Sequence, residues 1–177
     1  ASSFMIGKIQ GNIVDILYAP LSAGEVTLAI TLAAVTRSAM IAFISICIFH
    51  LIIDFEIKNY FILILYTFLS SFILGALGII AGLWAEKFDH MATVTNFIIV
   101  PLSFLSGTFY TIEKLPGYLQ TISKGNPFFY MIDGFRYSFI GQSDGSLTIG
   151  LIYLPVLSLI MFMTAYILYK KGYKIKY

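Results

Sequence analysis

Cys47 and His50 are the two side chains of this sequence whose types and spacing come closest to a metal site, because residues three positions apart share one face of a helix. A closed metal site usually needs about four ligands. No acidic side chain and no second histidine lies in the same helical turn, and the chain has a single cysteine. We therefore expect neither a bound metal nor a disulfide within the chain.

The sequence also gives little support for nucleotide binding or for proton transfer by this chain. The sequence contains no Gly-x-x-x-x-Gly-Lys-Ser/Thr segment, so we expect the chain to bind no nucleotide by itself. A proton relay inside a membrane needs buried carboxylates, yet all nine Asp and Glu residues lie at or beyond the ends of the long apolar stretches. We predict no catalytic residue and no bound cofactor, and the chain is not expected to be an enzyme by itself.

The composition is typical of an integral membrane protein. Of the 177 residues, 59% are hydrophobic and only 11% are charged, with a mean hydropathy of +0.89, whereas soluble domains are about a quarter charged. The net charge of +2 is too small to indicate a nucleic-acid partner. The chain begins with Ala1 and has no signal-peptide pattern, which indicates a fragment or a processed chain.

Four stretches are long and apolar enough to span a bilayer, which takes roughly 20 residues in a helix. Open sheet edges are excluded from lipid, so the sequence predicts an all-α membrane fold. Arg37 interrupts the first stretch, either as a snorkelling residue at the interface or as a functional charge inside the membrane. The predicted spans are residues 28–53, 60–84, 91–110 and 147–169.

The distribution of positive charge predicts the orientation of these spans. Four of the eleven Lys and Arg residues lie in the last eight positions, which favours a cytoplasmic C-terminus. Four spans then return the N-terminal segment to the same side. The cytoplasmic cations would be Lys8, Arg37, Lys87, Lys170, Lys171, Lys174 and Lys176, and the external ones Lys58, Lys114, Lys124 and Arg136.

Residues 1–23 are predicted to lie outside the membrane as a short amphipathic helix followed by a turn. Ile9 and Ile13 belong to an apolar stripe at four-residue spacing, and Asp15 lies off it. Ser22 and Glu25 have the spacing of a capping box for the next helix. The amphipathic helix either rests on the lipid surface or docks on a cytoplasmic partner.

Gly75, Gly78 and Gly82 share one face of the second predicted span, at spacings of three and four. Small residues on one face let another helix approach closely, so we predict a helix-packing surface here. Pro101 and Pro155 interrupt the third and fourth spans, where they are expected to kink the helix.

Residues 111–146 are predicted to form an outer interfacial region with a short helix at 115–123 and a longer one at 126–141. Asn126 suits the N-cap, Pro127 the first turn and Gly141 the end of the second helix. A helical wheel of this second helix places aromatic side chains on one face and turns Asp133 and Arg136 toward water. Asp133 and Arg136 are three positions apart and could form an ion pair. Together the two helices could form a re-entrant hairpin held by protein.

These segments resemble the membrane subunits of ABC-2 type exporters, in the order that the family has them. The resemblance rests on "IGKIQGNIVDILYAPLSAGEV", "PLSFLSGTFYTIEKLP" and "NPFFYMIDGFRY", and it runs over residues 1–177 as one transmembrane domain. It implies a six-span protein with both termini in the cytoplasm, of which this chain lacks the first two spans. Thr111 departs from the proline of many relatives, which concerns only the local turn.

The resemblance also implies partners and residue roles. A separate P-loop ATPase subunit would bind ATP and Mg²⁺, and a second permease subunit, in a homodimer, would complete the pathway in the bacterial plasma membrane. Residues 4–17 would be the coupling helix, with Ile9, Ile13 and Asp15 transmitting the motion of the ATPase. The outer gate would include Phe109, Tyr110, Phe128, Asp133, Phe135 and Arg136.

Drugs, polysaccharides and lipo-oligosaccharides all remain open as cargo, because apolar walls suit each of them. An ATP-independent channel or secondary transporter is an alternative function. A membrane scaffold that transports nothing is another. An adjacent reading frame for a P-loop ATPase would favour the exporter over the channel or secondary transporter, and transport assays in vesicles would separate all three.

Overall fold

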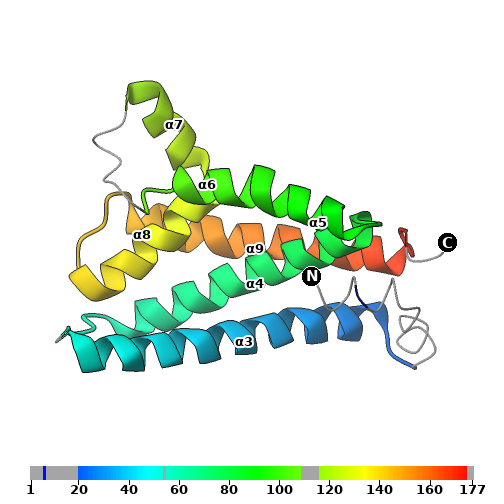
Figure 1. The fold of residues 1–177 in the computed structure, drawn as a ribbon, viewed down its shortest axis with the longest axis horizontal. Helices are drawn as coiled ribbons and strands as arrows, with labels where there is room; N and C mark the ends of the chain where they lie inside the picture. The colour runs from blue at the N-terminus through cyan, green and yellow to red at the C-terminus, as the bar shows by residue number, and fades with distance from the viewer. Residues whose placement is uncertain (1–5, 7–19, 54, 109–115, 175–177) are drawn as a thin grey trace.

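The computed structural model describes residues 6, 20–53, 55–108 and 116–174, and all regular structure in these ranges is helical. The predicted all-α fold is therefore confirmed for this part of the chain (Figure 1). The helices are α3 (Ala23–Ile52), α4 (Tyr60–Trp84), α5 (Phe88–Val94), the π-helix η1 (Thr95–Ile99), α6 (Val100–Phe104), α7 (Gly117–Gly125), α8 (Pro127–Ile140) and α9 (Leu147–Lys170).

Three of the described helices, α3, α4 and α9, are long and apolar enough to cross a membrane. They correspond to the first, second and fourth predicted spans, and α4 has the predicted bounds. Helix α3 begins at Ala23, before the predicted span of 28–53 and directly after the predicted capping box: Ser22 Oγ accepts from Glu25 N at 3.3 Å and Glu25 Oε2 accepts from Ser22 N at 2.7 Å.

The third predicted span, 91–110, has different bounds in the structure. A continuous helical run, α5–η1–α6, begins at Phe88 and ends at Phe104, where a turn with Gly107 at φ 79° follows. Within the run, Val100 N donates to Thr95 O, five residues back. Pro101 has no N–H to continue the α-helical pattern, which favours this π turn. The count of four spans stays a prediction.

Helix α4 is the centre of the fold and contacts α3, α8 and α9 (Figure 1). Two apolar clusters lie along it. One cluster joins α4 to the N-terminal half of α3 and the C-terminal half of α9, and it contains Val26, Ala76, Ile79, Leu83, Ala165 and Tyr169. The other joins α4 to α8 and α9, and it contains Ile62, Tyr66, Leu69, Ile73, Phe129, Tyr130, Met131 and Leu154.

Gly75 lies at a close approach of α3 and α4. A Cβ atom there would be 3.1 Å from Ala34 Cβ and 3.3 Å from Thr31 Cγ2. We expect Gly75→Ala to be tolerated with a small shift and Gly75→Leu to destabilise the fold by about 1–3 kcal/mol, because the larger side chain forces the helices apart. Thermal unfolding of both variants in detergent tests this. Equal stability of the two variants would contradict a close helix contact at Gly75.

Candidate functional site

Helix α8 lies across one end of the bundle, where it contacts α4, α6, α7 and α9 (Figure 1). Its ends are those that the sequence predicts: Asn126 Oδ1 accepts from Phe128 N at 3.0 Å, and Gly141 follows the last turn with φ 76°. Asn126 Nδ2 also donates to Leu102 O of α6 at 2.6 Å. The N-cap residue therefore fixes the start of α8 to the end of the third predicted span.

Lys58 and Asn59, directly before α4, hold the other end of α8. Both backbone N–H groups donate to Ser138 O, at 2.9 and 3.1 Å, and Lys58 Nζ donates to Ile140 O at 2.6 Å. These bonds satisfy carbonyls that the last turn of a helix leaves without a partner. The sequence indicates only that Lys58 is an external cation, because a contact across 82 positions leaves no local signal.

Tyr66 of α4 lies between two glycines, one on α8 and one on α9. A Cβ atom on Gly134 would be 1.9 Å from Tyr66 Cε1, and one on Gly150 would be 2.6 Å from the Tyr66 hydroxyl oxygen. That hydroxyl donates to Leu147 O at 3.3 Å, and the side chain is 1% exposed. The absence of Cβ atoms on both glycines is therefore what lets α4, α8 and α9 meet at this ring.

Asp133 of α8 is only 3% exposed, so the prediction that it faces water is wrong. Its carboxylate accepts from Ser143 Oγ at 2.6 Å, from Asp144 N at 2.7 Å and from Gly145 N at 3.2 Å. These bonds offset the cost of burying the charge. Because all three donors belong to the connection between α8 and α9, Asp133 fixes the chain just before the last span.

Arg136 does not form the predicted pair with Asp133. Its guanidinium forms an ion pair with Asp144 and donates to Gly107 O. The loop carrying Asp144 folds back over α8, so it supplies partners to both charges. Arg136 thereby joins the turn after α6 to the loop before α9. We call Asp133, Arg136, Ser143, Asp144 and Gly145 the outer clasp.

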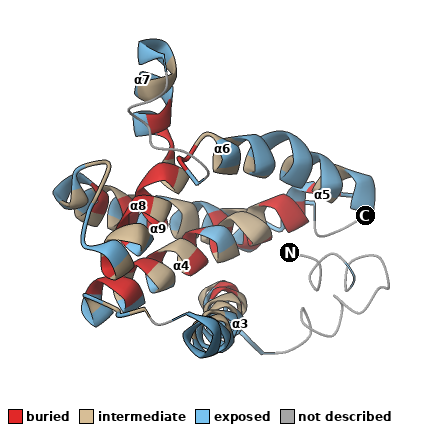
Figure 2. Cartoon of the chain, turned by 60° about the vertical axis from the view of Figure 1, so that its left-hand side comes forward, coloured by how far each residue is buried: buried red, intermediate tan, exposed pale blue. Residues whose placement is uncertain are grey.

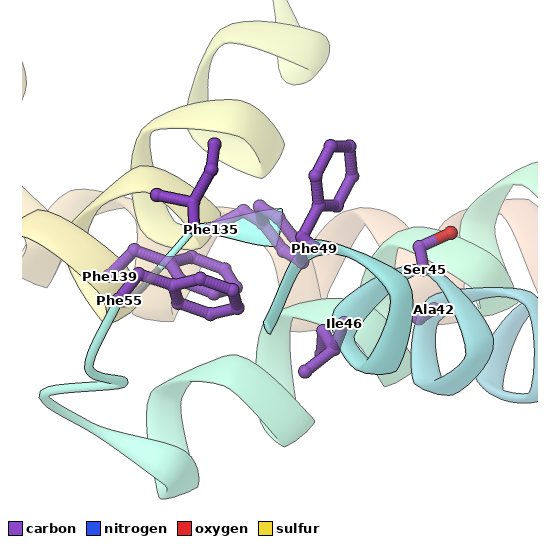
Figure 3. A pocket seen from close by; sticks show the side chains of 8 residues that line it. Ala42, Ser45, Ile46, Phe49, Phe55, Phe135 and Phe139 are labelled. Carbon is purple, nitrogen blue, oxygen red and sulfur yellow. The ribbon is translucent and has the colours of Figure 1, made fainter. Parts of the chain in front are cut away.

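The aromatic face of α8 borders an apolar hollow against the C-terminal half of α3. Phe135 is 39% exposed, and its ring centroid lies 5.1 Å from that of Phe139, which lies 5.6 Å from that of Phe55. Figure 3 shows these side chains together with Phe49 of α3. The hollow has a volume of about 470 Å³ and is lined by Ala42, Ser45, Ile46, Phe49, Ile53, Phe55, Phe135 and Phe139.

The other predicted gate residues are divided between the core and the part of the chain outside the described residues. Phe128 is half-buried against the cluster that contains Tyr130. Burial, followed by smaller effects of Tyr153 and Asp133, raises the pKa of the Tyr130 phenol above its ordinary value. Phe109 and Tyr110, like the coupling residues Ile9, Ile13 and Asp15, lie outside the described residues.

The other residues considered in the sequence are the possible metal ligands Cys47 and His50 and the glycines of α4. Cys47 is exposed, and the His50 ring packs edge-on against Phe55 at 5.7 Å. Gly78 and Gly82 lie on the α4 helix as predicted, and Gly82 is buried. Within the described ranges, no three His, Cys, Asp or Glu side chains gather in a way that would hold a metal.

Residues 141–145, Gly-Gln-Ser-Asp-Gly, match the Gly-x-Ser-x-Gly spacing of a hydrolase nucleophile. Such a serine lies in a turn from a strand to a helix, with a histidine as base. Here the segment follows α8, and Ser143 Oγ lies 2.6 Å from Asp133 Oδ2 and 2.7 Å from Gly145 O. The local structure does not resemble a nucleophile elbow.

Comparison with known proteins gives one family and a set of related permeases. The ABC-2 type transporter family model matches residues 1–140. The inner membrane transport permease YadH of Escherichia coli K12 is 32% identical over 144 residues, which are 81% of this chain and 56% of the relative, and the same values hold for YadH of Shigella flexneri. The chain thus spans about half the length of these relatives. No solved structure gives a significant match.

Proposed function

Because this chain belongs to the ABC-2 type transporter family, we propose that it is the membrane-spanning subunit of an ATP-driven exporter that moves an amphipathic or lipid-linked substrate outward. The observation that carries the proposal is the family match, which runs from the segment proposed to couple to an ATPase through α8. Three long apolar helices in the described residues make the chain a multi-pass membrane protein, which suits this role.

The positions of charged residues support the proposed orientation. Lys174 Nζ pairs with Glu86 Oε1 at 2.7 Å, which brings the C-terminal end of α9 next to the loop after α4. Both segments are predicted to be cytoplasmic. Lys58 and Arg136 lie at the opposite end of α4, around α8. We therefore place α7, α8 and the outer clasp on the external side, where they frame the exit.

In the proposed mechanism, ATP binding closes two partner ATPase subunits, and residues 4–17 pass the motion to α3. The capping box at Ser22 and Glu25 makes the start of α3 a defined point for this transfer. To switch the pathway nearly fully, ATP must favour one arrangement by about 5.5 kcal/mol. Because the outer clasp ties α8 to the loops before α9 and after α6, these parts are expected to move together.

Reconstitution of the full-length protein in vesicles tests the function. A fluorescent phospholipid should move between leaflets only when a partner P-loop ATPase and ATP are both present. Movement of the probe without any ATPase would instead establish a channel or secondary transporter. If the protein assembles with the ATPase but neither stimulates its ATP hydrolysis nor moves this or any drug-like or glycolipid probe, the scaffold function holds.

Ile13→Asp is expected to abolish stimulation of ATP hydrolysis while leaving membrane insertion intact, because a charge on the apolar stripe prevents docking on the ATPase. Asn12→Asp adds the same charge beside the stripe and serves as the matched control, with near-normal stimulation expected. Phosphate release and the amount of inserted protein are the two measurements. Normal ATP-driven transport by the Ile13 variant would remove the docking role of residues 4–17.

A further inference from the structure

The outer end of the helical run α5–η1–α6 is held by two side chains with matching spacing. Asn126 Nδ2 donates to Leu102 O at 2.6 Å, and Ser123 Oγ donates to Leu105 O at 2.9 Å. The two donors are three positions apart and so are the two acceptors, so the junction of α7 and α8 meets one turn at the end of α6. Asn126 is only 3% exposed and Ser123 is fully buried. We call these two bonds the α6 anchor.

The α6 anchor joins the run to the packed part of the molecule. Carbonyls in the last turn of a helix have no partner within that helix, so the anchor satisfies two of them where water has little access. Helix α8 in turn packs through Phe129, Tyr130 and Met131 against α4 and α9. Figure 2 shows these buried residues in α8 and the buried end of α7. The outer part of the run is therefore fixed to α4, α8 and α9.

The middle of the run is where its helix is weakest. Val100 N donates to Thr95 O, five residues back, instead of making the usual α-helical bond. Pro101, next in the chain, has no N–H to donate to Phe97 O. Residues 95–98 are exposed, so bending the run here disrupts little packing among the described residues. Prolines and π turns are the usual sites of sharp helix bends.

The inner part of the run, α5, is held only near its start. Its contacts with the bundle are with the end of α4, where the His90 ring lies 5.4 Å from that of Trp84 and His90 Nδ1 accepts from Glu86 N at 3.4 Å. The hydroxyls of Thr93 and Thr95 donate to carbonyls of their own run, at 2.8 and 3.0 Å. These two side chains therefore do not fix α5 to a neighbouring helix.

We propose that the run is a jointed span: the α6 anchor keeps its outer part fixed to α8, and α5 changes its angle about the π turn during transport. This inference rests on the proposed function, because ATP binding to the partner subunit drives the change. The start of α5 lies about 12 Å from the π turn, so a bend of about 20° moves it by about 4 Å. The movement alters the inner end of the span while the outer end stays in place.

Distances between spin labels test the joint. The full-length protein is prepared with Cys47→Ala, and with any cysteine outside the present sequence replaced. Labelled copies are diluted with unlabelled ones, so that distances within one copy are measured. One pair of exposed positions, Ala92→Cys with Ile167→Cys, compares α5 with α9, and another, Val100→Cys with Ile140→Cys, compares α6 with α8.

Trapping the transporter and its ATPase with ATP and vanadate should change the inner distance, between α5 and α9, by up to about 4 Å. The outer distance, between α6 and α8, should stay the same. Equal changes in both distances overturn the proposal. So does a constant inner distance in protein that transports, since the run is then rigid.

Pro101→Ala tests whether the π turn is the joint, because alanine restores an N–H and lets an α-helix continue. The variant should keep its melting temperature, while the change in the inner distance falls to about half or less. Pro155→Ala removes the proline inside α9, which is α-helical throughout, and is the matched control with a normal change expected. A full change of the inner distance in the Pro101 variant overturns the joint.

Asn126→Ser tests the α6 anchor, because serine caps a helix as well as asparagine but is too short to reach Leu102 O. The outer distance should become broadly distributed. Asn59→Ser makes the same change at the N-cap of α4, where Asn59 Oδ1 accepts from Ile62 N at 3.0 Å, and should leave the outer distance unchanged. Equal outer distances in the two variants overturn the anchor.

The inner distance also separates this inference from the proposed function. A broad distribution without ATP that narrows in the Pro101→Ala variant, in protein without ATP-driven transport, would sink the proposed function and leave the joint standing. ATP-driven transport with a constant inner distance would do the reverse.

Discussion

Gly134→Ala is expected to be the most damaging single substitution in the helical bundle, lowering stability by about 3 kcal/mol or more. The added methyl group would lie 1.9 Å from Tyr66 Cε1 and 2.1 Å from Cδ1. The ring has little room to move away, because Tyr66 is 1% exposed and its hydroxyl donates to Leu147 O. The expected fall in melting temperature, measured in detergent, is about 10 °C.

Gly125→Ala is the matched control for this substitution. It lies in the last turn of the adjacent helix α7, and a Cβ atom there meets nothing within 4 Å. Alanine has the better helix propensity by about 1 kcal/mol, so propensity alone predicts that both variants gain stability. If Gly134→Ala folds poorly, its effect should be much smaller in a Tyr66→Ala background. Equal stability of the Gly134 and Gly125 variants would contradict the close contact between α4 and α8.

Asp133→Ala should release the connection between α8 and α9 at a cost of about 2–4 kcal/mol. The substitution leaves Asp144 N and Gly145 N without their acceptor, whereas Ser143 Oγ can still donate to Gly145 O. Asp133→Asn keeps one acceptor oxygen and should cost less. The measurements are thermal unfolding and the rate of proteolysis between Gly141 and Leu147. Faster cleavage is expected in the alanine variant, because the loop loses the bonds that hold it on α8.

Asp89→Ala makes the same chemical change at an exposed position in the first turn of α5, and it should be nearly neutral. If the Asp133 and Asp89 variants unfold and are cleaved alike, the outer clasp does not stabilise this region. If the clasp also frames the exit, Asp133→Ala should reduce ATP-driven transport while ATP hydrolysis continues. That outcome would distinguish a defect at α8 from a defect in coupling through residues 4–17, which is expected to reduce ATP hydrolysis as well.

The outer clasp and the Tyr66 contact together connect the third predicted span, α8 and α9 at one end of the molecule. Arg136 bonds to Gly107 O and Asp144, and Asp133 bonds to the loop directly before Leu147. At the other end, the cluster around Val26 and Leu83 holds α3, α4 and α9. The C-terminal half of α3 is the least buried part of these long helices. We expect it to be the part of these helices that shifts most easily.

The sequence by itself determined the local features of this protein. The long apolar stretches of the sequence predicted α3, α4 and α9, because a membrane span requires a long run of residues with few charges. The ends of α3 and α8 followed from Ser22, Glu25, Asn126 and Gly141, since caps are made by residues within a few positions of each other. The family was also recognisable from motifs in the sequence.

Only the tertiary structure decided which side of α8 faces inward and which residues pair. A helical wheel separates Asp133 from the aromatic residues but contains no information on where water, lipid or protein lies. The loop at Ser143–Gly145 reverses the expected environment by folding back to supply donors to the buried carboxylate. Likewise, nothing in the sequence around Gly134 or Tyr66 indicates that they touch. Their contact exists because two helices distant in the chain pack so closely that a hydrogen atom is the only side chain that fits.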